Sequence, residues 1–452
     1  MAMPEQQDNF RRDAWVLLGL GVLGRLPALG LSGQVPIPAY FDGSYLHAAR
    51  DILHFSFPYF GIRVPVYPLL LALCGLNTRV IWILQALLGL AAGLMIYQMA
   101  FRRTRHALFS LLIGIFCSLA PEVLIYETSI MTETLTNFLL VASLWLMDRF
   151  AGEGKPGIWF PLGLGVLVAL GGLTRVLMLC LAPVYFCFLI PLWPPAKLIG
   201  REAIKKTAAY ALPVILLVFG WCGFVYHHTG FFSPTTHSGH NLMDQVDPLV
   251  DLAPQPYAAL RDAWIKARLH SYSFPNKNLN PAFEEAVAEV QARTGKPKAQ
   301  VWHEYQSLAF YLAFHHPLLY LRRAEQGWIQ FWAEPTLDET EWPESSTVTP
   351  IELLMTLETF LVREVEAVFL ILALVSIPCA LLRVKAFTKQ EYLIFIMVLW
   401  TSVFASFTEF GENRRFCVPF FMLIVYTLLT RVWVWINAAA GKEPAAASPE
   451  GA

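Results

Sequence analysis

The chain has 452 residues, of which 56% are hydrophobic and only 15% are charged. Soluble domains usually carry about 25% charged residues, so this composition excludes an ordinary soluble protein. The formal net charge of -1 and the lack of a long basic stripe argue against a nucleic-acid partner. The seven cysteines lie in or beside apolar runs without a C-x-x-C pair, so we expect neither a disulfide framework nor a zinc site.

Apolar stretches long enough to cross a bilayer recur along the chain, and basic clusters follow every second stretch. A span needs about 20 apolar residues, and Lys and Arg favour the cytoplasmic side. The sequence therefore predicts an all-α polytopic membrane protein with about ten transmembrane helices (roughly 8 to 12) and both termini in the cytoplasm. The expected spans are 14–31, 80–101, 107–120, 131–147, a fifth ending near 174, a sixth ending before 197, 208–225, 365–382, 392–407 and 416–436.

The spans divide the chain into modules. We predict an N-terminal transmembrane module at 1–226, a small and mainly helical external subdomain at 227–363, and C-terminal transmembrane helices at 364–436. The middle segment is too long for a simple connection and contains helix-like stretches. Residues 437–452 are rich in Ala, Pro and Glu, which is typical of a disordered tail.

The first outside loop, at 32–79, is expected to hold an interfacial helix. Tyr45, Ala48, Ala49 and Ile52 recur there at helical spacing, as in short amphipathic helices that lie on a membrane surface.

Charged residues at the outside edge of the spans form an ordered series. Asp42 follows the first span, and the loop later reads Arg63-Val-Pro-Val-Tyr67-Pro-Leu-Leu-Leu-Ala. This order resembles the GT-C superfamily of integral membrane glycosyltransferases, most closely the bacterial relatives of protein O-mannosyltransferases and of the lipid A aminoarabinose transferase. Further segments that fit the resemblance are Met131-Thr-Glu133-Thr-Leu, Gly172-Leu-Thr-Arg175, Gly239-His-Asn241-Leu and Glu412-Asn-Arg414-Arg415-Phe-x-x-Pro419.

The resemblance implies an enzyme that takes a sugar from a polyprenyl-phosphate carrier at the outer face of the membrane. It passes that sugar to an acceptor hydroxyl with inversion at the anomeric carbon. This chemistry needs a carboxylate to accept the proton, cations to stabilise the phosphate leaving group, and a lipid-facing groove for the isoprenoid. The implied partners are the donor, membrane lipid and an acceptor that is a protein, a lipid or a glycan. The implied location is the bacterial cytoplasmic (inner) membrane, with the active site facing the periplasm.

Two carboxylates are the predicted catalytic residues. Asp42 is the expected general base, because it lies outside and close to the membrane plane. Its alternative role is to cap the interfacial helix. The family often has a second acid beside this one, whereas Gly43 stands here and weakens any case for a paired-acid metal site. Glu133 sits where the chain re-enters the membrane, where a carboxylate is costly unless it is paired or faces water. Its alternative role is helix capping together with Thr132.

Arginines supply the predicted phosphate contacts, because their planar fork donates two parallel hydrogen bonds. The alternative for each is snorkelling to lipid headgroups or pairing with a local acid. Arg25, inside the first span, is expected to pair internally. The complete predicted substrate-binding set is Arg63, Tyr67, Arg175, Asn241, Glu412, Arg414 and Arg415.

We predict no resident cofactor. His237 and His240 have plausible metal-ligand spacing but no nearby cysteine, so a divalent metal is kept as an alternative. Two other functions stay open. A transporter or flippase of polyprenyl-linked sugars would keep charges near mid-membrane, and an inactive scaffold in glycan assembly would keep the fold without the chemistry.

Overall fold

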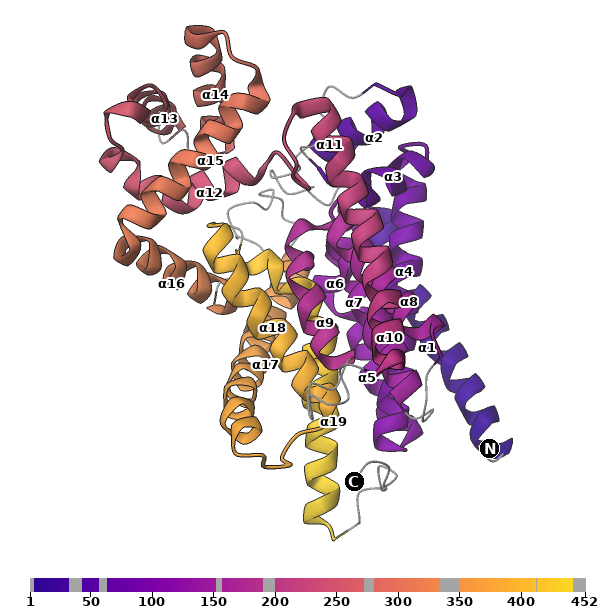
Figure 1. Cartoon of the computed structure of the whole chain (residues 1–452). Helices are drawn as coiled ribbons and strands as arrows, with labels where there is room; N and C mark the ends of the chain where they lie inside the picture. Colours follow the sequence, from indigo (N-terminus) through magenta and orange to yellow (C-terminus); the bar gives the residue numbers. More distant parts are fainter. Residues whose placement is uncertain are drawn as a thin grey trace.

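The computed structural model describes residues 4–31, 43–56, 63–151, 157–189, 200–271, 280–333, 349–411 and 413–441. All regular secondary structure in these ranges is helical, which confirms the predicted all-α class. The helices form a long bundle and a smaller group at one end of it (Figure 1).

The described helices include five that are long and apolar enough to cross a membrane. A sixth span results if α5 (Ala107–Leu119) and α6 (Pro121–Thr128), bent by 43°, cross together. α8 (Trp159–Thr174) and the pair of η1 (Val176–Leu181) and α9 (Ala182–Leu189) are apolar but shorter. The expected total of about ten spans therefore stays a prediction. The five are α4 (Thr78–Thr104), α10 to α11 (Arg201–Thr229), the Leu361–Leu381 part of α17 (Thr349–Leu381), α18 (Lys389–Thr408) and η7 to α19 (Asn413–Ala439).

The bundle has two distinct ends. α1 (Pro4–Leu31) begins and α19 (Phe421–Ala439) ends at the same end, which we call the terminus side (Figure 1). α2 (Ser44–His54) and α3 (Val66–Leu73) lie at the opposite end, the far side. The helix predicted in the first outside loop is thus present as α2. It buries Tyr45 and Ala49 against α3, as its helical spacing requires.

Small residues allow the bundle helices to approach closely. α7 (Glu133–Ala151) packs on α4 and α8, and α8 packs on α10 (Arg201–Val214). A Cβ at Gly165 of α8 would overlap the carbonyl oxygen of Tyr210 on α10. Without a hydrophobic driving force between helices in lipid, such close backbone packing is a main source of association.

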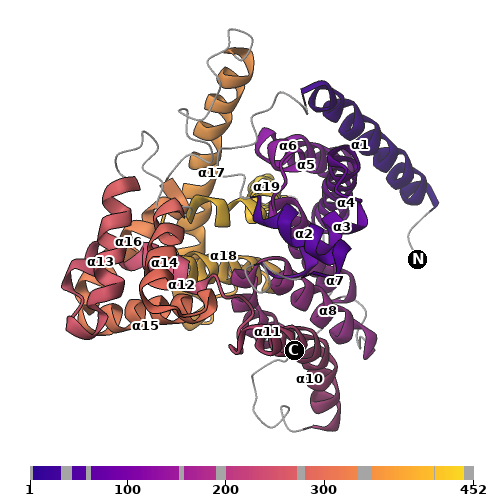
Figure 2. The same cartoon turned by 90° about the horizontal axis from the view of Figure 1, so that it is seen from above.

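A smaller helical group surrounds its own core on the far side. Figure 2 shows that this group lies to one side of the bundle, next to α17 and α18. Trp264, Phe283 and Tyr305 are fully buried in its core. Gln245 donates from Nε2 to the carbonyl of Ser406 at 2.9 Å and so ties the group to α18. Its helices are α12 (Ser238–Val246), α13 (Ala258–Ser271), α14 (Asn280–Thr294), α15 (Lys298–His315) and α16 (Pro317–Ala333).

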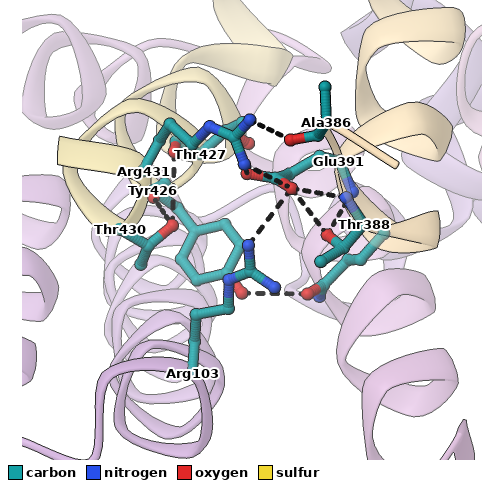
Figure 3. A network of polar contacts seen from close by, with 9 residues as sticks. Arg103, Ala386, Thr388, Glu391, Tyr426, Thr427, Thr430 and Arg431 are labelled. Carbon is teal, nitrogen blue, oxygen red and sulfur yellow. Dashed lines mark hydrogen bonds and ion pairs between the residues drawn. The ribbon is translucent and has the colours of Figure 1, made fainter. Parts of the chain in front are cut away.

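A polar network joins three helices on the terminus side (Figure 3). The Glu391 carboxylate accepts from Arg103 at 3.1 Å and from Arg431 at 3.3 Å. Thr388 and Glu391 form a capping box at the start of α18. Because Arg103 belongs to α4 and Arg431 to α19, this carboxylate holds the ends of α4, α18 and α19 together.

Candidate functional site

Glu133 collects two arginines from distant parts of the chain. It is the first residue of α7 and is only 1% exposed. Its Oε1 accepts from Arg175 Nη1 at 3.1 Å, and from Arg415 Nε and Nη2 at 3.1 and 3.0 Å. Arg175 directly follows α8, and Arg415 lies in η7 (Asn413–Phe416). We call Glu133, Arg175 and Arg415 the Glu133 cluster.

The Glu133 cluster combines one buried carboxylate with two partly exposed guanidinium groups. One carboxylate faces two guanidinium groups, whose side chains keep 11% and 17% exposure for Arg175 and Arg415. The Arg175 guanidinium also lies 4.2 Å from the centre of the Phe416 ring. The second carboxylate oxygen of Glu133 is buried and has no hydrogen-bond partner. Guanidinium groups at a partly exposed position are the side chains best suited to bind a phosphate.

The neighbouring Arg414 has different partners. Its Nη1 donates to Glu366, and its Nη2 donates to Glu122 at 3.3 Å. All three side chains are buried. Two carboxylates therefore enclose this guanidinium, and the pairs connect η7 to α6 and α17. The structure thus places Arg414 away from the Glu133 cluster, inside a buried ionic group.

The predicted residues of the first outside loop meet at α2 and α3. Arg63 donates from Nε to Ser44 Oγ at 2.8 Å and lies 4.6 Å from the centre of the Tyr45 ring. Tyr67 is fully buried and donates to Gln85 Oε1 at 2.9 Å. Burial, and then the nearby Tyr45 and Glu133, raise the pKa of the Tyr67 phenol. Tyr67 therefore lies next to the Glu133 cluster as a protonated, packed residue.

Two predicted residues, Asp42 and Glu412, lie outside the described residues. Their neighbours are described. Gly43 occupies the N-cap position of α2, and Ser44 accepts the hydrogen bond from Arg63. Asn413, which follows Glu412, is buried at the start of η7. In sequence, both acids therefore adjoin segments that carry predicted arginines.

Asn241 contacts a residue that the sequence did not single out. Its Nδ2 donates to Glu409 Oε2 at 3.0 Å. Glu409 follows the last residue of α18, so this contact ties α12 to the segment that leads into η7. Glu366 was also missed, although a lone carboxylate in an apolar span is a recognisable signal.

The histidine pair predicted as an alternative metal site forms a hydrogen-bonded chain. His237 Nε2 lies 3.0 Å from His240 Nδ1, and His240 Nε2 lies 3.3 Å from Asp244 Oδ2. Within the part of the chain that the structure describes, no group of three His, Cys, Asp or Glu side chains is arranged to hold a metal ion.

The predicted internal pairing of Arg25 is confirmed. Arg25 donates from Nε and Nη2 to the two carboxylate oxygens of Glu127 at 2.7 and 2.6 Å, and both side chains are buried. Gly89 leaves room for this pair, since a Cβ at that position would overlap the Glu127 carboxylate.

Comparison with known proteins supports part of the resemblance. Residues 66–221 match the family model described as "Dolichyl-phosphate-mannose-protein mannosyltransferase". This match confirms the resemblance over a segment that includes Tyr67, Glu133 and Arg175. No curated protein matches the chain.

Among solved structures, the chain is similar to the archaeal oligosaccharyltransferase AglB from Archaeoglobus fulgidus, in complex with an inhibitory peptide and a dolichol-phosphate. The sequence identity is 14% and the TM-score is 0.44, and the match covers 97% of this chain and 52% of that one. The chain thus spans about half the length of that protein.

Proposed function

We propose that this chain is a membrane glycosyltransferase that moves a sugar from a polyprenyl-phosphate donor to an acceptor hydroxyl. The observation that carries the proposal is the Glu133 cluster. It presents two partly exposed guanidinium groups, held by one buried carboxylate, and lies beside Tyr67. Glu133 and Arg175 also fall within the segment that matches a family of sugar transferases acting from a lipid phosphate.

In this proposal, Arg175 and Arg415 bind the phosphate of the donor. When the bond between the anomeric carbon and the phosphate oxygen breaks, its electron pair stays on that oxygen and the phosphate gains a negative charge. Guanidinium donors already held in place stabilise that charge more strongly than they stabilise the ground state. The buried Glu133 accepts hydrogen bonds from both arginines and so keeps them oriented.

Asp42 is the proposed general base. It accepts the acceptor's hydroxyl proton while the acceptor oxygen attacks the anomeric carbon on the face opposite the phosphate, which inverts that carbon. Asp42 directly precedes Gly43 and Ser44, and Ser44 is held by Arg63. A carboxylate at this point of the loop would share one side of the molecule with the cluster.

The remaining predicted residues take supporting roles. Arg414 acts as a positioning residue, because its buried carboxylate partners fix η7 and hence the backbone of Arg415. Tyr67 packs α3 against the cluster. Asn241 and Glu412 are proposed as acceptor contacts, from α12 and the segment before η7. No resident cofactor is needed for this reaction.

We place the protein in the bacterial cytoplasmic (inner) membrane, with the far side facing the periplasm. The charged cluster lies at one end of the bundle, where η7 and the starts of α7 and α19 meet. Chemistry at a membrane surface fits this location better than transport does, because transporters place their charged sites near mid-membrane.

Purified protein in liposomes that contain a labelled polyprenyl-phosphate sugar separates the alternatives. The proposal predicts label on an added acceptor extract and release of unglycosylated polyprenyl phosphate. Movement of the intact labelled lipid between leaflets, without transfer, would support the flippase instead. The scaffold would be supported if the protein showed no transfer and no movement of the lipid. In that case mass spectrometry should also find no polyprenyl phosphate that co-purifies with the protein.

A further inference from the structure

A cavity of about 360 Å³ lies on the terminus side, far from the Glu133 cluster. Its residues come from α1, α4 and α7, and from Arg105, which caps the C-terminal end of α4. Its lining residues are Phe10, Gln98, Phe101, Arg102, Arg105 and Arg149.

The cavity concentrates positive charge that the described residues neutralise only in part. Arg102 donates to Asp148 at 2.8 Å. Arg105 and Arg149 form no ion pair with any described residue, and both are exposed. Three guanidinium groups against one carboxylate leave a formal charge of +2 at the cavity (3 − 1).

The adjacent Arg103 differs from Arg105 and Arg149, because it has a carboxylate partner. It is part of the network in Figure 3, where it forms an ion pair with Glu391. The last turn of α4 therefore directs Arg102 and Arg103 to protein carboxylates. Arg105 caps the helix in a left-handed conformation (φ 53°) and stays available.

The inner wall of the cavity is apolar and held in place. The Phe10 ring stacks on Tyr97 at 5.4 Å and lies 6.5 Å from the Phe101 ring. On the α7 side, Trp145 donates to Gln98 Oε1 at 2.7 Å, and the Arg149 guanidinium lies 5.6 Å from the Trp145 ring. An occupant would thus meet both aromatic rings and guanidinium groups.

We propose that this cavity binds the headgroup of an anionic phospholipid, with its phosphate between Arg105 and Arg149. The cavity lies at the end of α4, a helix long and apolar enough to span the membrane, so it opens at the level of lipid headgroups. Basic pockets between membrane helices are suited to such headgroups. The aromatic wall would contact the glycerol and the first methylenes, which free phosphate lacks.

The test measures lipid binding to the full-length purified protein by native mass spectrometry, with phosphatidylglycerol, phosphatidylcholine and inorganic phosphate as probes. The double variant R105Q/R149Q should bind phosphatidylglycerol about thirty-fold more weakly than the unmodified protein, and each single variant about five-fold more weakly. Phosphatidylcholine binding should not change. The matched control R201Q/K206Q removes the same charge from α10 on the same side and should bind as the unmodified protein does.

Three results would overturn the proposal. An equal loss of phosphatidylglycerol binding in R201Q/K206Q would mean that the lipid responds only to the general surface charge. Equal binding of the two lipids by the unmodified protein would mean that no anion site exists there. Full displacement of phosphatidylglycerol by an equal concentration of inorganic phosphate would mean that the site takes free phosphate. Because Arg105 and Arg149 are exposed and form no ion pair with the described residues, the variants should keep the melting temperature of the lipid-free protein.

Discussion

Arg415 donates two hydrogen bonds to one carboxylate oxygen of Glu133, a residue 282 positions earlier in the sequence. This ion pair brings the segment before α19 to the start of α7, where Arg175 completes the cluster. Neither half of the chain contains the complete set, so both are needed to form the proposed donor site.

Replacing Glu133 by Gln keeps the side-chain size but removes the charge that orients both arginines. We expect sugar transfer to fall by at least about a hundred-fold, since a cluster of like charges without its anion rearranges. The measurement is the initial rate of label transfer from a saturating polyprenyl-phosphate donor. The matched control is Glu202→Gln, an exposed acid on α10. If Glu133→Gln transferred sugar at a rate within two-fold of the unmodified protein, Glu133 would not be needed to orient the two arginines.

Arg414 and Arg415 should respond differently to the same kind of change. Arg415→Lys should raise the donor KM by about ten-fold or more with little change in stability, because an ammonium lacks the planar fork. Arg414→Met should lower stability by about 3–5 kcal/mol, because Glu366 and Glu122 would stay buried without their cation. Thermal melting and donor titration of both variants separate the two effects. Similar KM values for Arg415→Lys and the unmodified protein would contradict the phosphate role.

The Arg25–Glu127 pair offers a test of buried charge that does not involve the site. Arg25→Met alone should cost about 3–5 kcal/mol, because the buried Glu127 loses the cation that it pairs with. Adding Glu127→Gln should restore much of that loss, since an amide is far less costly to bury than an unpaired carboxylate. A double-mutant cycle measured by thermal or chemical unfolding gives the coupling. Simple additivity of the two changes would show that the pair contributes nothing as a unit.

His237 predicts how the stability of the small helical group depends on pH. Burial, and then His240, Arg63 and Lys298, lower the pKa of His237 well below 6.5. Folding therefore disfavours the protonated form, so the stability of this group is complete above about pH 6.5 and falls as the pH drops below it. Unfolding followed by tryptophan fluorescence between about pH 7.5 and pH 5 should show the decrease.

The His237→Asn variant should lose most of this pH dependence. His227→Asn, which changes an exposed histidine on α11, should keep it. A pH profile that is the same for His237→Asn and the unmodified protein would assign the dependence to other groups.

Much of the fold follows from local patterns. Apolar runs of sufficient length give the helices, and the spacing of Tyr45 and Ala49 gives the buried face of α2. The pairing of Arg25 was predictable because an isolated charge inside a span must find a partner. Apolar runs alone do not determine the number of transmembrane spans. α8, for example, is apolar but shorter than a bilayer requires.

The different ion-pair partners of Arg414 and Arg415 could not be predicted from the sequence. The two residues are adjacent and identical in type, so local sequence does not distinguish them. Their partners come from remote segments: Glu122 and Glu366 for Arg414, and Glu133 for Arg415. Only the packing of α6, α7 and α17 around η7 determines which arginine is enclosed and which is left partly exposed.

Glycosyl transfer by the Asp42→Asn variant shows whether Asp42 accepts the proton of the acceptor hydroxyl. The assay uses full-length protein in liposomes with a labelled polyprenyl-phosphate sugar and an acceptor extract. Asp51→Asn, the same chemical change on α2, serves as the matched control. We expect the rate of sugar transfer by Asp42→Asn to fall about a hundred-fold or more, because the proton acceptor is removed. The variant should still bind the donor. Transfer by Asp42→Asn at the rate of the Asp51→Asn protein would contradict the role of Asp42 as general base.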